Sequence, residues 1–132
     1  MTIRIQRGPK ESAYERWGGD AFFTTLVERF YAGVSADPLL RPLYPEDLTG
    51  PKAHLALFLA QYWGGPRHYS EQRGHPRLRM RHAPFVIGEA QADAWLRHMT
   101  DAVQAAGLDP TDQEDLLGYL SMASRSLINS RG

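Results

Sequence analysis

His82 is the side chain in this sequence best suited to bind a metal, and it follows a basic segment and stands two residues before Pro84. Because proline has no N–H and restricts the residue before it, a helix that carries His82 must end close behind it. Tyr31, Tyr44 and Trp95 occur elsewhere, at positions compatible with one shared space. One imidazole nitrogen with three aromatic hydrogen-bond donors suits a flat metal-bearing cofactor that holds a small polar molecule on its far side.

The size and composition predict one globular domain over residues 1–132. A chain of 132 residues, 42% of them hydrophobic, buries roughly two thirds of its unfolded surface. It has no cysteine, which excludes disulfides and thiolate metal sites. Its longest apolar run, residues 55–60, is far shorter than the ~20 residues of a membrane helix. The first five residues lack the features of a secretory signal. We therefore expect a cytoplasmic protein without membrane insertion, in which about residues 1–11 form a flexible extension.

The charges balance overall but not locally. The chain has 15 basic and 15 acidic side chains, which argues against a nucleic-acid partner because phosphate binding needs a basic surplus. Within residues 67–81, however, Glu71 is the only acid, and five arginines surround it: Arg67, Arg73, Arg77, Arg79 and Arg81. Such a patch can hold an anion, although a solvated loop surface is the alternative interpretation.

Apolar residues recur at helical spacing in residues 22–34, 55–62, 95–106 and 116–128, and no segment alternates like a strand. This pattern predicts an all-α fold. Residues 64–86 lack the periodicity and hold three glycines and three prolines, so we expect this segment either to have a functional role or to be ordered by a ligand. Helix boundaries are predicted from known start and stop residues: Ser12 with Glu15, Gly18-Gly19, Asp20, Asp37-Pro38, Thr49, Gly64-Gly65-Pro66, Gly107 and Asp109-Pro110.

Several motifs together carry a family resemblance: Phe30-Tyr31, Tyr44-Pro45-Glu46-Asp47, the run from Gln61 to Pro66, the run from Tyr69 to Phe85, and Ala94-Trp95-Leu96. From about residue 12 onward the chain resembles the bacterial truncated haemoglobins, specifically their second group. The resemblance implies a globin-like two-over-two helical sandwich around haem b. It also implies a long proximal loop and a proximal helix of about one turn.

The resemblance assigns His82 as the proximal ligand of the haem iron. It assigns Tyr31, Tyr44 and Trp95 as the distal residues that stabilise a ligand on the iron. The remaining implied haem contacts are Arg81 and Tyr69 at the propionates, His54, Leu55, Phe58, Phe85 and Met99. The distal-helix position that faces the iron falls near Gly50 and Pro51, and its assignment stays open. The other histidines, His68, His75 and His98, are interpreted as loop or surface groups.

By this resemblance the protein would bind dioxygen and other small diatomic or anionic ligands. A hydrogen bond to a charged acceptor contributes roughly 1.5–3 kcal/mol, so two donors would slow oxygen release by roughly 10²- to 10⁴-fold. A protein of that kind carries oxygen poorly and suits scavenging, sensing or redox chemistry. The alternative is a nitric oxide dioxygenase or a peroxidase, which requires an external reductase because the chain has no flavin or nicotinamide fingerprint.

Interpretations without haem also remain. Taken alone, His82 is compatible with a structural histidine, and Tyr31 and Trp95 with core residues, although buried donors would then need partners. A haem-free helical interaction module, or a zinc site that uses His75 and His82, is a further alternative. These two histidines are seven residues apart with Pro76 between them, unlike the i, i+4 ligand pair of a zinc helix. The sequence also allows a homodimer.

Overall fold

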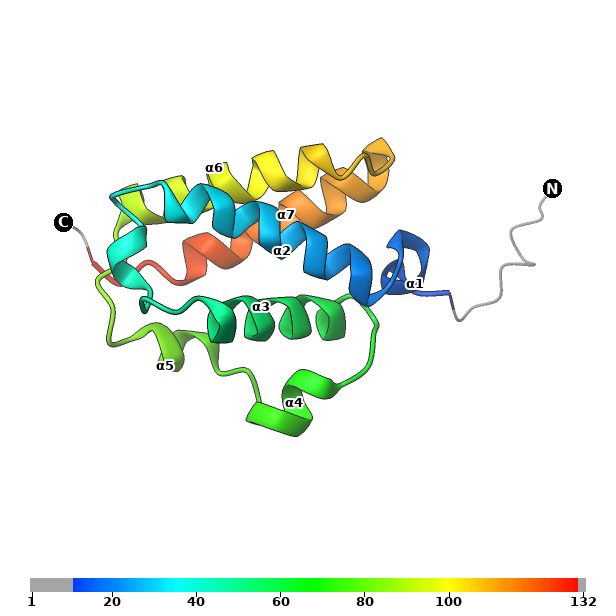
Figure 1. Ribbon diagram of the computed structural model, residues 1–132, viewed down its shortest axis with the longest axis horizontal. Coiled ribbons are helices and arrows are strands. Elements are labelled where there is room, and N and C mark those ends of the chain that lie inside the picture. The colour runs from blue at the N-terminus through cyan, green and yellow to red at the C-terminus, as the bar shows by residue number, and fades with distance from the viewer. Residues whose placement is uncertain (1–10, 131–132) are drawn as a thin grey trace.

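In the computed structural model, which describes residues 11–130, helices carry the whole architecture and the described residues contain no strand (Figure 1). The elements in chain order are α1 (Ala13–Trp17), α2 (Asp20–Ser35), the 3-10 turn η2 (Arg41–Leu43), α3 (Thr49–Tyr62), α4 (His68–Arg73), α5 (Leu78–His82), α6 (Glu89–Ala105) and α7 (Pro110–Ser126). The predicted all-α fold is therefore confirmed. The expected flexible extension, about residues 1–11, lies outside the described residues except for Glu11.

The four long helices form two antiparallel pairs, α2 with α3 and α6 with α7, and α2 packs across α6 to join the pairs (Figure 1). This is the expected two-over-two sandwich. The apolar stripes of the sequence supply its core, because i, i+3 and i+4 positions share one helix face. The fully buried side chains of the core include Phe23, Leu26, Phe30, Val34, Met99, Val103, Leu116 and Leu120.

The strongest boundary signals of the sequence work as predicted. Ser12 and Glu15 form a capping box at α1, and Gly18 ends that helix with a φ of 114°. Asp109 caps α7 by accepting from the Asp112 N–H, with Pro110 as the first helical residue. At both helix starts a short polar side chain, that of Ser12 or Asp109, accepts from a backbone N–H that has no partner within the first helical turn.

Three predicted helix starts are wrong in detail. Asp20 is the first residue of α2, not its cap, and its carboxylate accepts from the Tyr14 hydroxyl at 2.8 Å. Thr49 is likewise inside α3, and the Asp47 carboxylate accepts from its N–H at 2.9 Å. The Asp37 carboxylate accepts from the Leu39 N–H at 2.9 Å, as a cap would, but the residues that follow form turns before η2 and no α-helix. An aspartate near a helix start can thus form hydrogen bonds other than the predicted capping bond.

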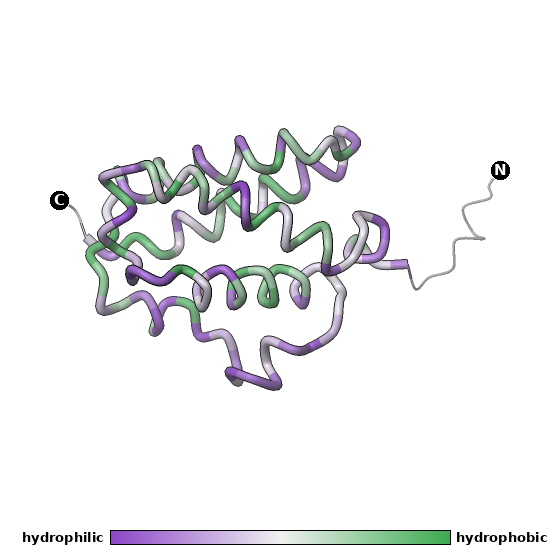
Figure 2. Tube along the Cα trace, viewed as in Figure 1, coloured by the Kyte–Doolittle hydropathy of each residue, from purple (hydrophilic) through white to green (hydrophobic). Residues whose placement is uncertain are grey.

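The segment from residue 64 to 86 is less irregular than its composition suggests. It contains α4 and the five-residue α5, and the latter confirms the expected very short proximal helix. α4 was not predicted, since six residues are too few to show periodicity. Arg81 ties the two helices together by donating to the carbonyls of Pro76 and Arg73, both at 2.8 Å. Figure 2 shows that the chain around α4 is mostly hydrophilic, so this arm stands at the outer edge of the fold.

His98 is not the surface group that the sequence suggested. Its side chain is only 18% exposed, and its Nε2 lies 2.7 Å from the Asp37 carboxylate. The ring also packs against the backbone of Gly33, where a Cβ would lie 2.4 Å from its Nδ1. This contact joins α6 to the end of α2. His68 and His75 are exposed, as expected. Within residues 11–130 no helix is long and apolar enough to cross a membrane.

The close approach of Gly65 to the first helix gives a test of this packing. A Cβ at Gly65 would lie 2.6 Å from the Tyr14 ring and 2.9 Å from the Ala60 carbonyl oxygen. We expect Gly65→Ala to lower the free energy of unfolding by about 1–3 kcal/mol, as overpacking does. The matched control is Gly118→Ala in α7, where a Cβ meets nothing within 4 Å; it should stabilise the helix by about 0.5–1 kcal/mol. Equal urea unfolding curves for the two variants would contradict the close packing of Gly65 against Tyr14.

Candidate functional site

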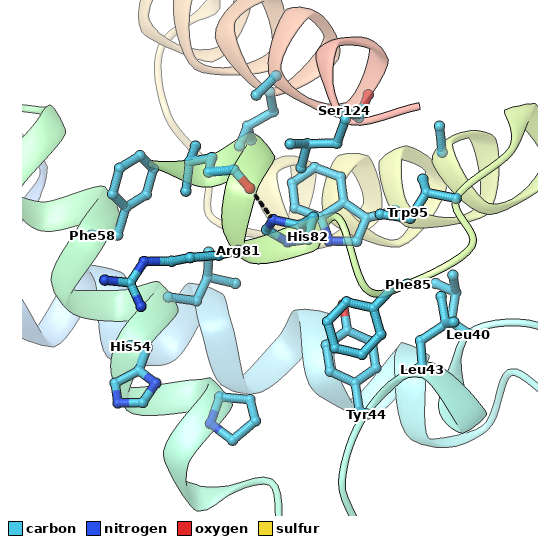
Figure 3. A pocket seen from close by; sticks show the side chains of 18 of the residues that line it. Leu40, Leu43, Tyr44, His54, Phe58, Arg81, His82, Phe85, Trp95 and Ser124 are labelled. Carbon is cyan, nitrogen blue, oxygen red and sulfur yellow. Dashed lines mark hydrogen bonds between the residues drawn. The ribbon is translucent and has the colours of Figure 1, made fainter. Parts of the chain in front are cut away.

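A cavity of about 360 Å³ opens between the two helix pairs and the α4–α5 arm (Figure 3). The predicted site residues that line it are Tyr31, Tyr44, His54, Leu55, Phe58, Tyr69, Arg81, His82, Phe85 and Trp95. Met99 is the exception, because it is fully buried in the core and is not among the lining residues. Pro51 lines the cavity and Gly50 does not, so the open distal-helix position carries no side-chain donor here.

The imidazole of His82 is held in one tautomer by its own helix. Its Nδ1 lies 2.7 Å from the Leu78 carbonyl oxygen, one turn earlier in α5 (Figure 3). A carbonyl oxygen only accepts, so Nδ1 carries the proton and the lone pair stays on Nε2. Neutral imidazole with a carbonyl behind it is the usual form of a metal-binding histidine. Asn129 supports the turn after α5 by donating to the Phe85 carbonyl at 2.9 Å.

One edge of the cavity is basic. Arg81 and His54 lie on one side of the view in Figure 3, opposite Leu40 and Leu43. Arg73 shares that side, since its Nη1 donates to His54 Nε2 at 3.1 Å. The histidine therefore accepts and is neutral, and burial, followed by the charges of Arg73 and Arg81, lowers its pKa.

Arg73 was part of the basic run in the sequence, but nothing in the sequence set it apart from its neighbours. The structure does: its Nε is buried without a hydrogen-bond partner, and its guanidinium lies 5.9 Å from the centre of the Tyr69 ring. None of the described residues that line the cavity is Asp or Glu. A buried guanidinium donor in a cavity lined by no acid is suited to the carboxylate of a ligand.

The opposite part of the cavity holds the three predicted aromatic donors. The Tyr31 and Tyr44 rings meet edge to face, with centroids 5.4 Å apart, and Trp95 packs on Phe30 at 5.3 Å. Burial raises the pKa of Tyr44 to about 12, although Trp95 and Tyr31 act on its hydroxyl as hydrogen-bond donors and favour the ionised form. Burial also raises the pKa of Tyr31. Both phenols therefore stay protonated throughout the physiological range.

The fold and this cavity define a globin. The sequence model of the bacterial-like globin family matches residues 12–129. The group 2 truncated hemoglobin YjbI of Bacillus subtilis (strain 168) is 44% identical over 111 residues, 84% of each chain. Among solved structures, a thermostable hemoglobin of the actinobacterium Thermobifida fusca is 52% identical with a TM-score of 0.88, over 90% of this chain and 98% of that one. A truncated oxygen-avid haemoglobin of Bacillus subtilis is 43% identical with a TM-score of 0.85, over 90% of this chain and 100% of that one.

The chain belongs to the bacterial-like globin family, as a truncated haemoglobin of the second group. Members of this family bind haem b, and the cavity fits that group in its own chemistry. It combines an imidazole with a free lone pair, walls that are largely apolar, and an unpartnered guanidinium donor. The protein therefore binds haem b and, through it, small gaseous ligands such as oxygen. The described residues hold no cluster of three or more His, Asp or Glu side chains for another metal.

The raised phenol pKa values predict a loss of stability at alkaline pH. Tyr31, Tyr44 and Tyr119 keep their protons to higher pH in the folded chain than in the unfolded chain, whose phenols titrate near 10. The stabilisation is complete below pH 10 and is lost as the pH rises toward 12, by up to about 1.4 kcal/mol per pH unit for each phenol. Urea unfolding at pH 8, 10 and 11 measures this, and Tyr44→Phe should flatten the decline. Constant stability from pH 9 to 11 would refute it.

Proposed function

We propose that His82 binds the haem iron through Nε2 and that the protein binds dioxygen on the opposite side. The observation that carries this proposal is the hydrogen bond from His82 Nδ1 to the Leu78 carbonyl, which leaves a lone pair on Nε2 at the cavity wall. The α5 helix ends directly at this residue, so the imidazole stands at a helix terminus that Asn129 anchors. Haem supplies the iron that binds the ligand; the chain orients the cofactor and sets its surroundings.

At the basic edge we assign the haem propionates to Arg73, Arg81 and His54. Arg73 Nε has no other partner, and Arg81 is already oriented by two backbone carbonyls. A guanidinium that is held in place loses less entropy when it pairs with a carboxylate. The Tyr69 hydroxyl is a further donor in the same region, beneath the Arg73 guanidinium. The apolar contacts of the porphyrin would come from Leu55, Phe58 and Phe85.

On the distal side the three aromatic residues have different roles. An indole N–H can only donate. Burial is the main cause of the raised pKa of Tyr31, and a hydrogen bond to Tyr44 raises that pKa further, as it does when the Tyr31 hydroxyl is the donor. Tyr44 therefore accepts from both Tyr31 and Trp95, which leaves its own proton free for a ligand. Bound dioxygen carries partial negative charge on its outer atom, so we assign Tyr44 as its main donor and Tyr31 and Trp95 as residues that orient it.

Slow oxygen release follows from this arrangement. A donor held in place by two neighbours needs little rearrangement to bond the ligand. The similarity to a solved truncated haemoglobin described as oxygen-avid also supports slow oxygen release. We therefore favour scavenging, sensing or ligand redox chemistry in place of oxygen transport. The same donors also suit peroxide or hydrosulfide on the iron, and any nitric oxide dioxygenase or peroxidase turnover would draw electrons from an external reductase.

Replacement of His82 tests the proximal assignment. We expect His82→Gly to lose the axial histidine spectrum of the reduced and carbon monoxide forms, and added imidazole should restore it by occupying the space that the side chain leaves. His75→Gly is the matched control, since it removes an exposed imidazole from the same segment. Absorption spectra report the axial ligation, and far-UV circular dichroism checks folding. Unaltered axial coordination in His82→Gly would overturn the assignment.

The distal assignment predicts an order of effects. Tyr44→Phe removes the hydroxyl proton that we assign to the bound ligand. Oxygen dissociation should therefore accelerate by roughly 10- to 10²-fold, the equivalent of one hydrogen bond to a charged acceptor. Tyr31→Phe and Trp95→Phe should accelerate it less, because each removes a group that orients Tyr44. Stopped-flow oxygen displacement measures the rates. Carbon monoxide dissociation is the internal control, since that ligand carries little negative charge. Unchanged oxygen dissociation in Tyr44→Phe and Trp95→Phe would disprove the distal role.

A further inference from the structure

A surface groove lies directly behind the wall of the haem cavity, between the loop that follows α5 and the segment that follows α7. The two segments run side by side (Figure 1), joined by a hydrogen bond of 2.8 Å from the Asn129 N–H to the Ile87 carbonyl. Phe85 and Leu127 line this groove, and both also line the haem cavity. A single layer of side chains therefore separates the groove from the cofactor site at this point.

Exposed apolar side chains gather in the same short part of the chain. Val86 lines the groove and is 63% exposed, and Met80 in α5 is 59% exposed. Neither of them lines the haem cavity, so their exposed surface faces solvent. Of the six large hydrophobic side chains that are exposed within the described residues, three lie between residues 80 and 86. Apolar surface gathered in this way is typical of an interaction site.

The charge of this region is positive. Arg79 is exposed and lines the groove, where its Nε donates to the Ser126 carbonyl at 3.2 Å. Arg77, directly before α5, is exposed as well. Residues 72–88 include no Asp or Glu, so no acid of this segment offsets the two arginines. We call Arg77, Arg79, Met80, Phe85 and Val86 the proximal surface. It combines exposed apolar side chains with positive charge, which an acidic protein would complement.

We propose that the proximal surface is the docking site of an acidic electron-transfer protein that reduces the haem iron. Oxygen binds to ferrous haem, so a molecule whose iron has become ferric needs one electron before it binds oxygen again. One electron passes from the reduced carrier to the ferric iron, and no bond is made or broken. Electron transfer falls steeply with distance, and here the wall of Phe85 and Leu127 is thin. The inference rests on the proposed function, because it requires haem in this cavity.

Two other occupants fit the proximal surface less well. A symmetric interface between two copies of this chain would bring Arg77 and Arg79 of one copy against the same residues of the other, and like charges disfavour that contact. An anionic lipid surface would satisfy the charge and the apolar side chains. It would give no role, however, to the thin wall between the groove and the cavity. The position of the groove therefore favours an electron carrier.

The experiment mixes ferric haem-loaded protein with reduced plant-type ferredoxin, a small acidic iron–sulfur protein, in an anaerobic stopped-flow instrument. We expect the second-order rate constant of haem reduction to fall as salt is added, because exposed charges are screened. Arg79→Glu should lower it about tenfold at low ionic strength, and Arg77→Glu should lower it in the same direction. Arg29→Glu is the matched control. It makes the same change of charge at an exposed position of α2 that lines neither the groove nor the cavity, and it should change the rate constant little.

A second measurement detects docking without electron transfer. Isothermal titration calorimetry of the haem-loaded protein with oxidised ferredoxin should show several-fold weaker binding for Arg79→Glu and for Met80→Gln. Met122→Gln is the control for the apolar contact, since Met122 is 60% exposed on α7 and lines neither the groove nor the cavity. The haem absorption spectrum and reduction by a neutral photoreduced deazaflavin should match the parent protein in every variant, which separates failure of the haem site from failure of docking.

Two results would contradict the proposal. One is a ferredoxin rate constant and affinity for both Arg77→Glu and Arg79→Glu that equal those of Arg29→Glu. The other is binding to phosphatidylglycerol vesicles, or a dimer in analytical ultracentrifugation, that both variants abolish while ferredoxin still reduces them at the parent rate. The vesicle result would assign the proximal surface to a membrane, and the dimer result would assign it to a second copy of this chain.

Discussion

The hydrogen bond between His82 Nδ1 and the Leu78 carbonyl is the constraint on which the site depends. A five-residue helix has little stability of its own, and without this bond the imidazole could carry its proton on either nitrogen. With it, the lone pair is on the nitrogen that remains for the iron. The helix is held from both sides, by Arg81 reaching back to the α4 region and by Asn129 reaching in from the end of α7. Side chains from outside the helix thus hold this short helix in place where it carries the candidate iron ligand.

The cavity separates its polar functions in space. The described lining has cations at one edge, aromatic donors at another and no acid, so a dianionic planar ligand has one favourable orientation. Burial keeps the Tyr44 phenol protonated by raising its pKa to about 12. The same burial that stabilises the sandwich thereby maintains a hydrogen-bond donor over the whole physiological pH range. The low-dielectric interior thus both accompanies the packing of the helices and keeps the Tyr44 phenol available as a donor to a ligand.

Contacts outside the cavity set the position of its distal side. The His98–Asp37 pair joins α6 to the turn after α2, and Tyr31 and Trp95 lie on those same two helices. A shift of one helix against the other would therefore change the distal donors. The stacked rings of Tyr62 and Tyr119 join α3 to α7 in a similar way, and Tyr119 lines the cavity. Each of these contacts therefore holds two helices at the cavity in a fixed relative position.

The sequence alone determined the all-α class, the core stripes and the strongest caps, because these depend on neighbours within a few residues. Its motifs also supported the assignment of the family, and with it the haem and the candidate residues His82, Tyr31, Tyr44 and Trp95. Tertiary structure decided what depends on distant partners: Asp20 bonds Tyr14 in place of capping α2, His98 is an interior group, Met99 lies in the core away from the cavity, and Arg73 has a buried donor without a partner. Residues of the same type differ in these respects because local sequence does not encode which side chains the folded chain brings within hydrogen-bond distance.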